Sequence, residues 1–325
     1  MSLLIRSVTA LITLLLGLIG PQAIAQEYPA RPIRLIVPFG PGGVLDIVGR
    51  AYAQALERRV GQSVVVENRP GASGNIGTAL VATSPADGYT LLFAFDGTMA
   101  INPHVYAKPG FDPITDFVAI SKVGNSTQML VAAPSLPASS LSELISKKST
   151  LKGLSYGTSG TASPGHVSGE MLRMASGLEL IHVPYKGGAA AVNDVMAGQI
   201  PLAFTAVATA KPLIESGKLK GLAVTTGARS SLLPSIQTFV EAGLADFVVD
   251  TWLGVMAPAR TPAAIIERLS RESMAIVADP EMRTRLIGLG VEPSGSDSAS
   301  FARQLSADLA RWAKVVRDAG INVNP

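Results

Sequence analysis

Short apolar runs rich in β-branched residues alternate with segments of helical periodicity along most of the chain. The strands expected from these runs cover residues 33–39, 63–67, 90–95 and 118–123, and then 129–133, 154–156, 180–183, 201–205 and 221–225. Apolar residues recur at helical spacing between them, at 46–60, 75–83, 141–147, 165–175, 189–197, 210–216 and 236–242. Strands that alternate with helices are typical of βαβ units on a mostly parallel sheet. The pattern therefore predicts an α/β fold.

The pattern changes toward the C-terminus. After an apolar stretch at 247–257 it predicts two long amphipathic helices, 262–289 and 298–318, with no strand between them and a break in the first at Asp279-Pro280. Helices of this kind pack on a sheet formed earlier, so we expect the chain to return to its first domain. The expected domains are residues 26–127 with 251–325 as lobe 1 and 128–250 as lobe 2, joined by two crossing strands.

The first 25 residues have the pattern of a secretory signal peptide. Arg6 is followed by an apolar run over 8–19 and by the small-residue pattern Ala23-Ile24-Ala25. The run is shorter than the roughly 18 to 20 apolar residues that span a bilayer as a helix. The alternative is a membrane anchor that is never cleaved. We expect cleavage, a periplasmic mature protein and no stable membrane insertion afterwards.

Composition excludes several classes of function. Cysteine is absent, so the chain has no disulfide framework, thiolate nucleophile or cysteine-bound metal. The formal net charge of +3 is small for 325 residues, and Lys and Arg are scattered singly, so no nucleic-acid partner is expected. The three histidines, His104, His166 and His182, are not spaced as metal ligands. No cofactor or metal is expected.

A glycine-rich segment follows the first expected strand. It runs from Phe39 through Gly40-Pro41-Gly42-Gly43 into a helix that begins near Val44-Leu45-Asp46. Glycines let the backbone turn sharply and direct free N–H groups to one point, beside the positive end of the helix dipole. A carboxylate is the expected ligand. The alternative is a plain strand-to-helix turn that needs glycine only for its geometry.

Similar segments follow other strands. Asp96-Gly97-Thr98 follows the third strand, and Thr158-Ser159-Gly160 precedes the helix that holds His166. Tyr185, Lys186 and Thr205 lie at further strand ends, where an open α/β sheet binds its ligand. Ordinary capping is the favoured role for Ser163, and a lone lysine such as Lys186 is more often solvated.

The sequence gives little support to catalysis. No Gly-x-Ser-x-Gly elbow stands at a strand–helix junction. Ser159 and His166 resemble a nucleophile and a base, but no third group is suggested by position. We therefore expect a binding protein and not an enzyme.

Several motifs stand in order along the chain: Tyr28-Pro29-x-Arg31-Pro32, Val64-Val65-Val66-Glu67-Asn68-Arg69-Pro70-Gly71-Ala72, Asp87-Gly88-Tyr89-Thr90-Leu91-Leu92, Ile101-Asn102-Pro103, His182-Val183-Pro184-Tyr185-Lys186-Gly187 and Ala257-Pro258-x-x-Thr261-Pro262. With these motifs the chain resembles the substrate-binding receptors of tripartite tricarboxylate transporters, also called Bug receptors. The resemblance implies a type II periplasmic-binding-protein fold, in which two α/β lobes close on a ligand. It also implies that Pro41-Gly42-Gly43 and Thr158-Ser159-Gly160, with His166 nearby, hold one carboxylate end of that ligand.

Two positions depart from the family pattern. Val44-Leu45 stands where the first loop usually carries a Thr or Ser before Asp46, and Thr205 stands where relatives often carry Asp. Both changes indicate a less polar pocket, suited to an aromatic or short aliphatic carboxylate.

The resemblance implies a monomeric periplasmic receptor that captures a small carboxylate for the membrane subunits of a transporter. The alternative is a binding protein that signals to a membrane sensor. The candidate ligand-binding residues are Phe39, Pro41, Gly42, Gly43, Val44, Leu45, Asp46, Asp96, Gly97, Thr98, Thr158, Ser159, Gly160, His166, Tyr185, Lys186 and Thr205.

Overall fold

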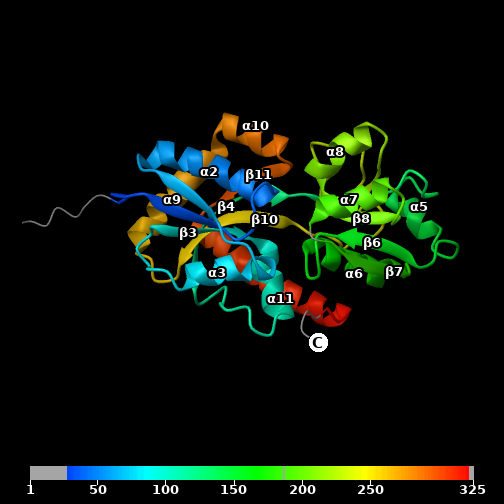
Figure 1. Cartoon of the computed structure of the whole chain (residues 1–325), viewed down its shortest axis with the longest axis horizontal. Coiled ribbons are helices and arrows are strands. Elements are labelled where there is room, and N and C mark those ends of the chain that lie inside the picture. Colours follow the sequence, from blue (N-terminus) through cyan, green and yellow to red (C-terminus); the bar gives the residue numbers. More distant parts are fainter. Residues whose placement is uncertain (1–27, 186, 322–325) are drawn as a thin grey trace, which may run out of the picture. The chain divides into compact units, whose positions relative to one another are not determined.

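Two β-sheets organise the computed structural model, which describes residues 28–185 and 187–321 (Figure 1). The first sheet has the order β11-β4-β10-β3-β1-β2 and the second β7-β6-β8-β5-β9. The first is built from β1 (Ile33–Val37), β2 (Val64–Asn68), β3 (Thr90–Phe95), β4 (Phe117–Ser126), β10 (Thr251–Pro258) and β11 (Val291–Ser296). The second is built from β5 (Gln128–Ala132), β6 (Leu154–Thr158), β7 (Leu180–Pro184), β8 (Leu202–Ala206) and β9 (Lys220–Val224).

The two sheets share one strand arrangement. In the first, β2, β1 and β3 are parallel, and β10 runs antiparallel between β3 and β4. In the second, β7, β6 and β8 are parallel, and β5 runs antiparallel between β8 and β9. Each antiparallel strand is the one that enters from the other sheet, and only Thr127 separates β4 from β5. This arrangement confirms the predicted α/β class.

The predicted division into lobes follows these sheets but stays a prediction. Both sheets lie within one compact unit of the chain that begins at Arg31. The largest apolar core includes Ile36 and Leu92 of the first sheet with Tyr156 and Phe204 of the second.

Helices cover both faces of the first sheet (Figure 1). On one face lie α2 (Val44–Val60), α9 (Ala263–Ala278) and α10 (Pro280–Gly288). On the other lie α3 (Asn75–Ala82), the π-helical turn η2 (Gly97–Ile101), α4 (Asn102–Val105) and α11 (Ser298–Ala319), and a 3₁₀ turn η1 (Ala72–Gly74) precedes α3. Asp279 separates α9 from α10, because its carboxylate caps α10 by accepting from the Met282 amide at 3.0 Å. The break therefore lies where Asp279-Pro280 predicts it.

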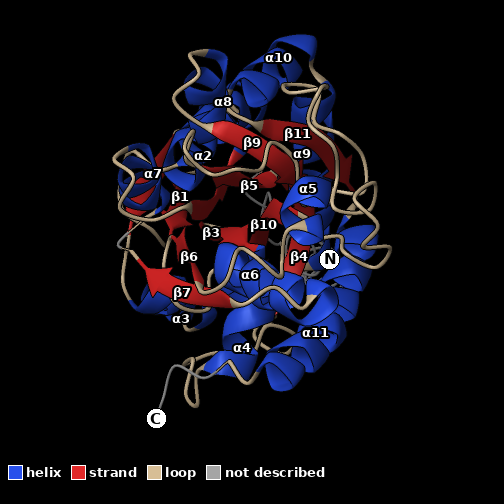
Figure 2. Cartoon of the chain, turned by 90° about the vertical axis from the view of Figure 1, so that its right-hand side faces the viewer, coloured by secondary structure: helices blue, strands red, loops and turns tan. Residues whose placement is uncertain are grey.

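The second sheet has the same layers (Figure 2). α6 (Pro164–Ser176) lies on one face, and α7 (Gly188–Met196) and α8 (Val207–Glu215) lie on the other, with α5 (Leu141–Ser146) following β5. α11 packs on β4 and also reaches α6. Among the described residues, no helix combines the length and the apolar character needed to cross a membrane.

One strand was not predicted. β11 joins the edge of the first sheet beside β4, where Val291 pairs with Ser126 and the register is irregular between Pro293 and Ser296. Its sequence, VEPSGS, has few β-formers, and proline is tolerated because the strand lies at an edge. The expectation of no strand between the last two long helices was wrong, because tertiary pairing decides the conformation here.

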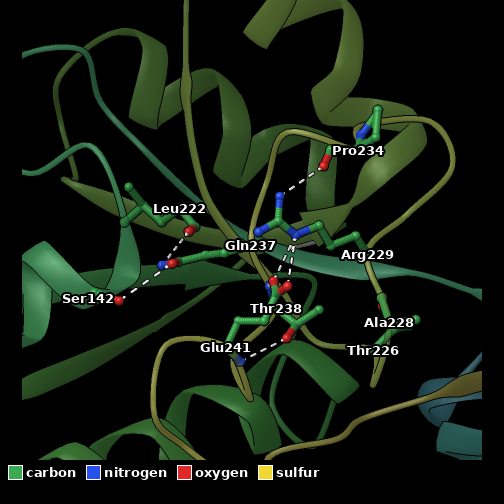
Figure 3. Close-up of polar contacts among 9 residues, drawn as sticks. All are labelled: Ser142, Leu222, Thr226, Ala228, Arg229, Pro234, Gln237, Thr238 and Glu241. Atoms are coloured by element: carbon green, nitrogen blue, oxygen red, sulfur yellow. Dashed lines mark hydrogen bonds and ion pairs between the residues drawn. The ribbon is translucent and has the colours of Figure 1, made fainter.

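The helix predicted over 236–242 was also wrong, since this segment forms turns inside a long connection from β9 to β10. Polar side chains fix the connection (Figure 3). Arg229 donates to both carboxylate oxygens of Glu241, at 2.9 and 3.0 Å, and to the Pro234 carbonyl at 3.1 Å. The apolar spacing that suggested a helix instead buries Phe239, which stacks on Phe247 with ring centroids 4.0 Å apart.

Candidate functional site

The carboxyl edges of the two sheets meet where the chain crosses between them. β4 ends at Ser126, and β5 begins two residues later at Gln128, which pairs with Ala206 at the carboxyl end of β8. On the return, Thr251 at the start of β10 pairs with Ser126, and Leu253 pairs with Phe95 at the end of β3. The loops after β1, β3, β6 and β8 therefore lie at the carboxyl edges of their sheets, where the chain crosses from one sheet to the other. In open α/β sheets this is where ligands bind.

The loop after β1, residues 38–43, leads into the uncapped start of α2. Gly42 has φ of +85°, which favours glycine, and Gly43 is the N-cap of α2 without any side chain bonded to the first turn. Gly42 and Gly43 are exposed, and no atom of the described residues lies within 4 Å of where a Cβ would stand on either. The positive end of the 17-residue helix α2 therefore faces open space, as an anion site requires.

Asp46 braces this loop from behind. One carboxylate oxygen accepts from the Gly42 amide at 2.9 Å, and the other accepts from Asn68 at 2.9 Å and lies 3.0 Å from Arg50. Burial opposes ionisation, but the hydrogen bonds from Arg50, Gly42 and Asn68 outweigh it and lower the pKa of Asp46. Asn68 also donates to the Phe39 carbonyl at 3.0 Å. The side chain of Asp46 is therefore used in shaping the loop.

The apolar candidate residues around this loop differ in how far their side chains are exposed. Phe39 is half-buried and meets Phe95 edge to face, with ring centroids 5.6 Å apart. Leu45 is buried in the core, whereas Val44 is half-buried and Pro41 is exposed. Leu45 can therefore offer the site only its backbone, whereas Phe39, Pro41 and Val44 have exposed apolar surface.

The segment after β3 is enclosed. Asp96, Gly97 and Thr98 are all buried, and the Thr98 hydroxyl donates to the Ser73 carbonyl at 2.9 Å. Burial, with a contribution from the nearby Asp308 carboxylate, raises the pKa of Asp96 well above its ordinary value. The sequence places Asp96, Gly97 and Thr98 among the candidate ligand-binding residues. In the structure they are buried, and the Thr98 hydroxyl is used in a bond to the backbone.

The loop after β6, residues 158–162, is the second set of candidates. Gly160 has φ of +138°, and its amide donates to the Thr158 hydroxyl at 3.2 Å. Ser159 is exposed at the tip of the loop. Ser163 caps α6 by accepting from the His166 amide at 3.3 Å, as predicted.

Two histidines stand behind this loop, one of them missed at the sequence level. The His166 ring stacks on His182 with centroids 3.8 Å apart and planes 12° apart. His166 Nδ1 accepts from the Ala162 amide at 3.1 Å, and His182 Nε2 lies 2.7 Å from the Thr158 hydroxyl. The pair could not be predicted, because β7 and α6 bring together residues that are 16 positions apart (182 minus 166).

The remaining candidates lie near the start of α7. Tyr185 donates its hydroxyl to Asp194 at 2.6 Å, which raises the pKa of Tyr185 to about 12, so only its ring remains for a ligand. Thr205 is buried, and its hydroxyl lies 3.3 Å from where a Cβ on Gly188 would stand. Lys186 lies outside the described residues.

Two further helix starts lie near these candidates. α7 follows Gly187 and α8 follows Ala206, and neither N-cap residue has a side-chain bond to its helix. The first amide of α8, on Val207, donates to the Thr127 carbonyl at the crossing, at 2.9 Å. Ala206-Val207 carries neither a glycine nor a polar cap, so its sequence gave no signal.

Comparison with known proteins places the chain in a family. The profile described as tripartite tricarboxylate transporter family receptor (TctC) matches residues 48–321. Protein BugT of Bordetella pertussis is 33% identical over 306 residues, covering 94% of each chain. An Agrobacterium vitis protein, the UPF0065 protein in the TAR-I ttuE-ttuC' intergenic region, is 34% identical over 299 residues, covering 91% of this chain and 86% of that protein.

Solved structures agree with this result. An R. palustris protein with adipate (Rpa4515) is 37% identical with a TM-score of 0.83, covering 91% of this chain and 99% of that one. The periplasmic binding protein BugD is 33% identical with a TM-score of 0.79 and the same coverage, 91% and 99%. MatC of Rhodopseudomonas palustris, with bound malate, is 27% identical with a TM-score of 0.77, covering 89% and 100%. The predicted periplasmic-binding-protein fold is confirmed, and the chain belongs to the tripartite tricarboxylate transporter receptor family, the Bug receptors.

Proposed function

We propose that this chain is a periplasmic receptor that captures a small carboxylate between its two sheets and delivers it to a tripartite tricarboxylate-type transporter. The observation that carries the proposal is the uncapped start of α2 after Gly42-Gly43, at the sheet edge where the chain crosses. The adipate and malate in the R. palustris relatives support a carboxylate as the ligand.

Backbone amides supply enough binding energy for this role. A hydrogen bond to a charged group contributes about 1.5 to 3 kcal/mol, and micromolar binding corresponds to about 8 kcal/mol. A few such bonds, from the α2 start and from residues 158–162, therefore suffice once the costs of ordering are deducted. The proposed ligand contacts are the amides of Gly43, Val44 and Ser159, with Phe39 and Tyr185 as apolar walls.

The side chains near the site favour an acid with an apolar body. The resemblance implies that Leu45 and Thr205 stand where relatives often carry a hydroxyl and a carboxylate. Calorimetry with adipate, malate, citrate and benzoate tests this preference. We expect adipate or benzoate to bind more tightly than citrate, and exclusive binding of citrate would contradict it.

Gly43→Val tests the first loop. Gly43 has an ordinary φ of −79° and open space around its Cβ position, so the variant is expected to fold while its side chain blocks the α2 amides. Carboxylate binding should become undetectable by calorimetry. Gly288→Val, at the end of α10 with equally open surroundings, is the matched control and should bind as the natural protein does. Unchanged affinity in Gly43→Val would remove this loop from the site.

Export and delivery have separate tests. The proposed signal peptide lies outside the described residues, and N-terminal sequencing of protein from the periplasm should begin at Gln26. Capture of membrane subunits on the immobilised receptor, with and without adipate, separates transport from signalling. Recovery of transporter subunits supports delivery, and recovery of a sensor kinase contradicts it.

A further inference from the structure

We propose that His166 positions the amide loop 158–162, and that it does so only as a neutral imidazole that accepts a hydrogen bond at Nδ1. This inference rests on the proposed function, because it assumes that the loop binds the carboxylate. His166 is then a positioning residue that acts through Ala162, and not a direct positive partner of the ligand.

The loop reaches His166 at a strained position. Ala162 is a buried, non-glycine residue with φ of +62°, a left-handed conformation that costs free energy for any residue with a Cβ. Its amide donates to His166 Nδ1 at 3.1 Å, and the His166 amide in turn donates to Ser163 Oγ at 3.3 Å. These two bonds hold Ala162 in place at the start of α6.

The bond from Ala162 fixes the tautomer of His166. A nitrogen that accepts an N–H cannot carry a proton itself, so the neutral ring must be protonated at Nε2. The ring lies flat against His182, whose Nε2 is 2.7 Å from the Thr158 hydroxyl that accepts the Gly160 amide. The stacked rings therefore hold the loop at both ends, His166 through Ala162 and His182 through Thr158.

The surroundings keep both rings neutral. Burial lowers the pKa of His166, against the opposing effect of Glu170 on the same helix. Burial and the neighbouring His166 lower the pKa of His182, on β7, to about 4. Glu170 is itself paired with Arg173 at 2.8 Å and accepts from the Tyr156 hydroxyl of β6 at 2.9 Å. α11 also packs against α6, and its residues Trp312 and Val316 belong to the apolar core.

Protonation at Nδ1 would remove the acceptor of the Ala162 amide. The neutral arrangement is complete above the ordinary histidine pKa and is lost as the pH falls through the lowered one. Acid should therefore weaken carboxylate binding by releasing the loop. A histidine that paired directly with the ligand would act in the opposite sense, because its positive charge would strengthen binding.

His166→Asn and His166→Leu separate these roles. The asparagine oxygen can take the place of Nδ1 as an acceptor but does not titrate, and leucine cannot accept. With adipate as the probe at about pH 7.5, His166→Leu should bind about tenfold more weakly, the equivalent of one hydrogen bond, and His166→Asn should recover most of that loss. Between about pH 7.5 and about pH 4.5 the natural protein should lose affinity steeply relative to His166→Asn, a ratio that cancels titration of adipate itself. His104→Asn, at a histidine on α4, should follow the natural protein.

Several outcomes would overturn the inference. They are full affinity in His166→Leu, identical pH profiles in the natural protein and His166→Asn, or affinity in the natural protein that rises in acid. Imidazole ¹⁵N shifts of the ligand-free protein give a second measurement that does not depend on either variant folding. They should show His166 protonated at Nε2, and protonation at Nδ1 would contradict the assignment. Failure of adipate and every other acid to bind the natural protein would count against the proposed function, while the ¹⁵N shifts would still decide the state of His166.

Discussion

Single residues behind the first loop decide whether its amides point outward. Asp46 accepts from Gly42 and Asn68 and pairs with Arg50, and the carboxylate is 4% exposed. Removing the acceptor would take this partner away from the Gly42 amide and from the Asn68 side-chain amide, which costs free energy. The conformation of the loop at residues 38–43 therefore depends on the Asp46 carboxylate.

Asp46→Ala should lower the free energy of unfolding by about 1 to 3 kcal/mol near pH 7. The pKa of Asp46 is lowered on folding, so its contribution is present above the pKa of the unfolded chain and is lost as the pH falls through the folded value. Urea unfolding near neutral pH and near pH 3 should show the gap to the natural protein closing in acid. Asp318→Ala removes an exposed pair with Lys314 and should leave the free energy of unfolding nearly unchanged. If the two variants lowered the free energy of unfolding equally, Asp46 would not stabilise the loop in this way.

At the scale of elements, one threonine joins the two crossing segments. The hydroxyl of Thr225 donates its one proton to the Val249 carbonyl at 2.9 Å and lies 3.2 Å from the Gln128 carbonyl, to which the Thr225 amide donates at 2.9 Å. Thr225 is fully buried directly after β9. The start of β5 and the approach to β10 are thus tied at one point.

Thr225→Val keeps the shape of the side chain and removes only the hydroxyl. Because the buried Val249 carbonyl would lose that donor, we expect a loss of about 1 to 2 kcal/mol in urea unfolding. Thr284→Val, on the exposed face of α10, also removes a hydroxyl bond to a backbone carbonyl and should have little effect. If both variants unfolded at the same urea concentration, the Thr225 hydroxyl would not stabilise the two crossing segments.

The strands and most helices were predictable because their local pattern agrees with their tertiary setting. β11 and the turns at 236–242 were not, because an edge pairing and the burial of Phe239 overrode local preference. The loop after β1 could be identified from its glycines. The role of His166 could not, since the stack with His182 depends on how α6 crosses β7.

At the scale of the whole molecule, elements of the first sheet touch the second sheet beyond the crossings. An alanine Cβ at Gly290, between α10 and β11, would lie 2.4 Å from the Ala208 Cβ in the first turn of α8. Nearby, Ser231 in the connection after β9 donates to Glu292 of β11 at 2.6 Å. The start of α8, whose first amide binds Thr127, is therefore packed against the turn before β11.

Gly290→Ala should destabilise this contact and weaken carboxylate binding. Gly61→Ala is the matched control, because Gly61 has nearly the same φ, +72° against +75°, and also follows a helix, but has open space around its Cβ position. In both variants an alanine in the left-handed conformation lowers the free energy of unfolding by about 1 kcal/mol. Only Gly290→Ala also displaces α8. Thermal unfolding and calorimetry should give a greater loss of stability and of affinity for Gly290→Ala. Equal affinities would show that this contact does not influence the site.

The central claim is that backbone amides from both sheets hold one small carboxylate. Amide ¹H–¹⁵N spectra recorded during a titration with adipate test it most directly. The account predicts that the amides of Gly43 and Val44 and that of Ser159 shift together, with one midpoint and saturation at one ligand per chain. Shifts confined to one of the two loops, or to neither while adipate binds elsewhere, would contradict it.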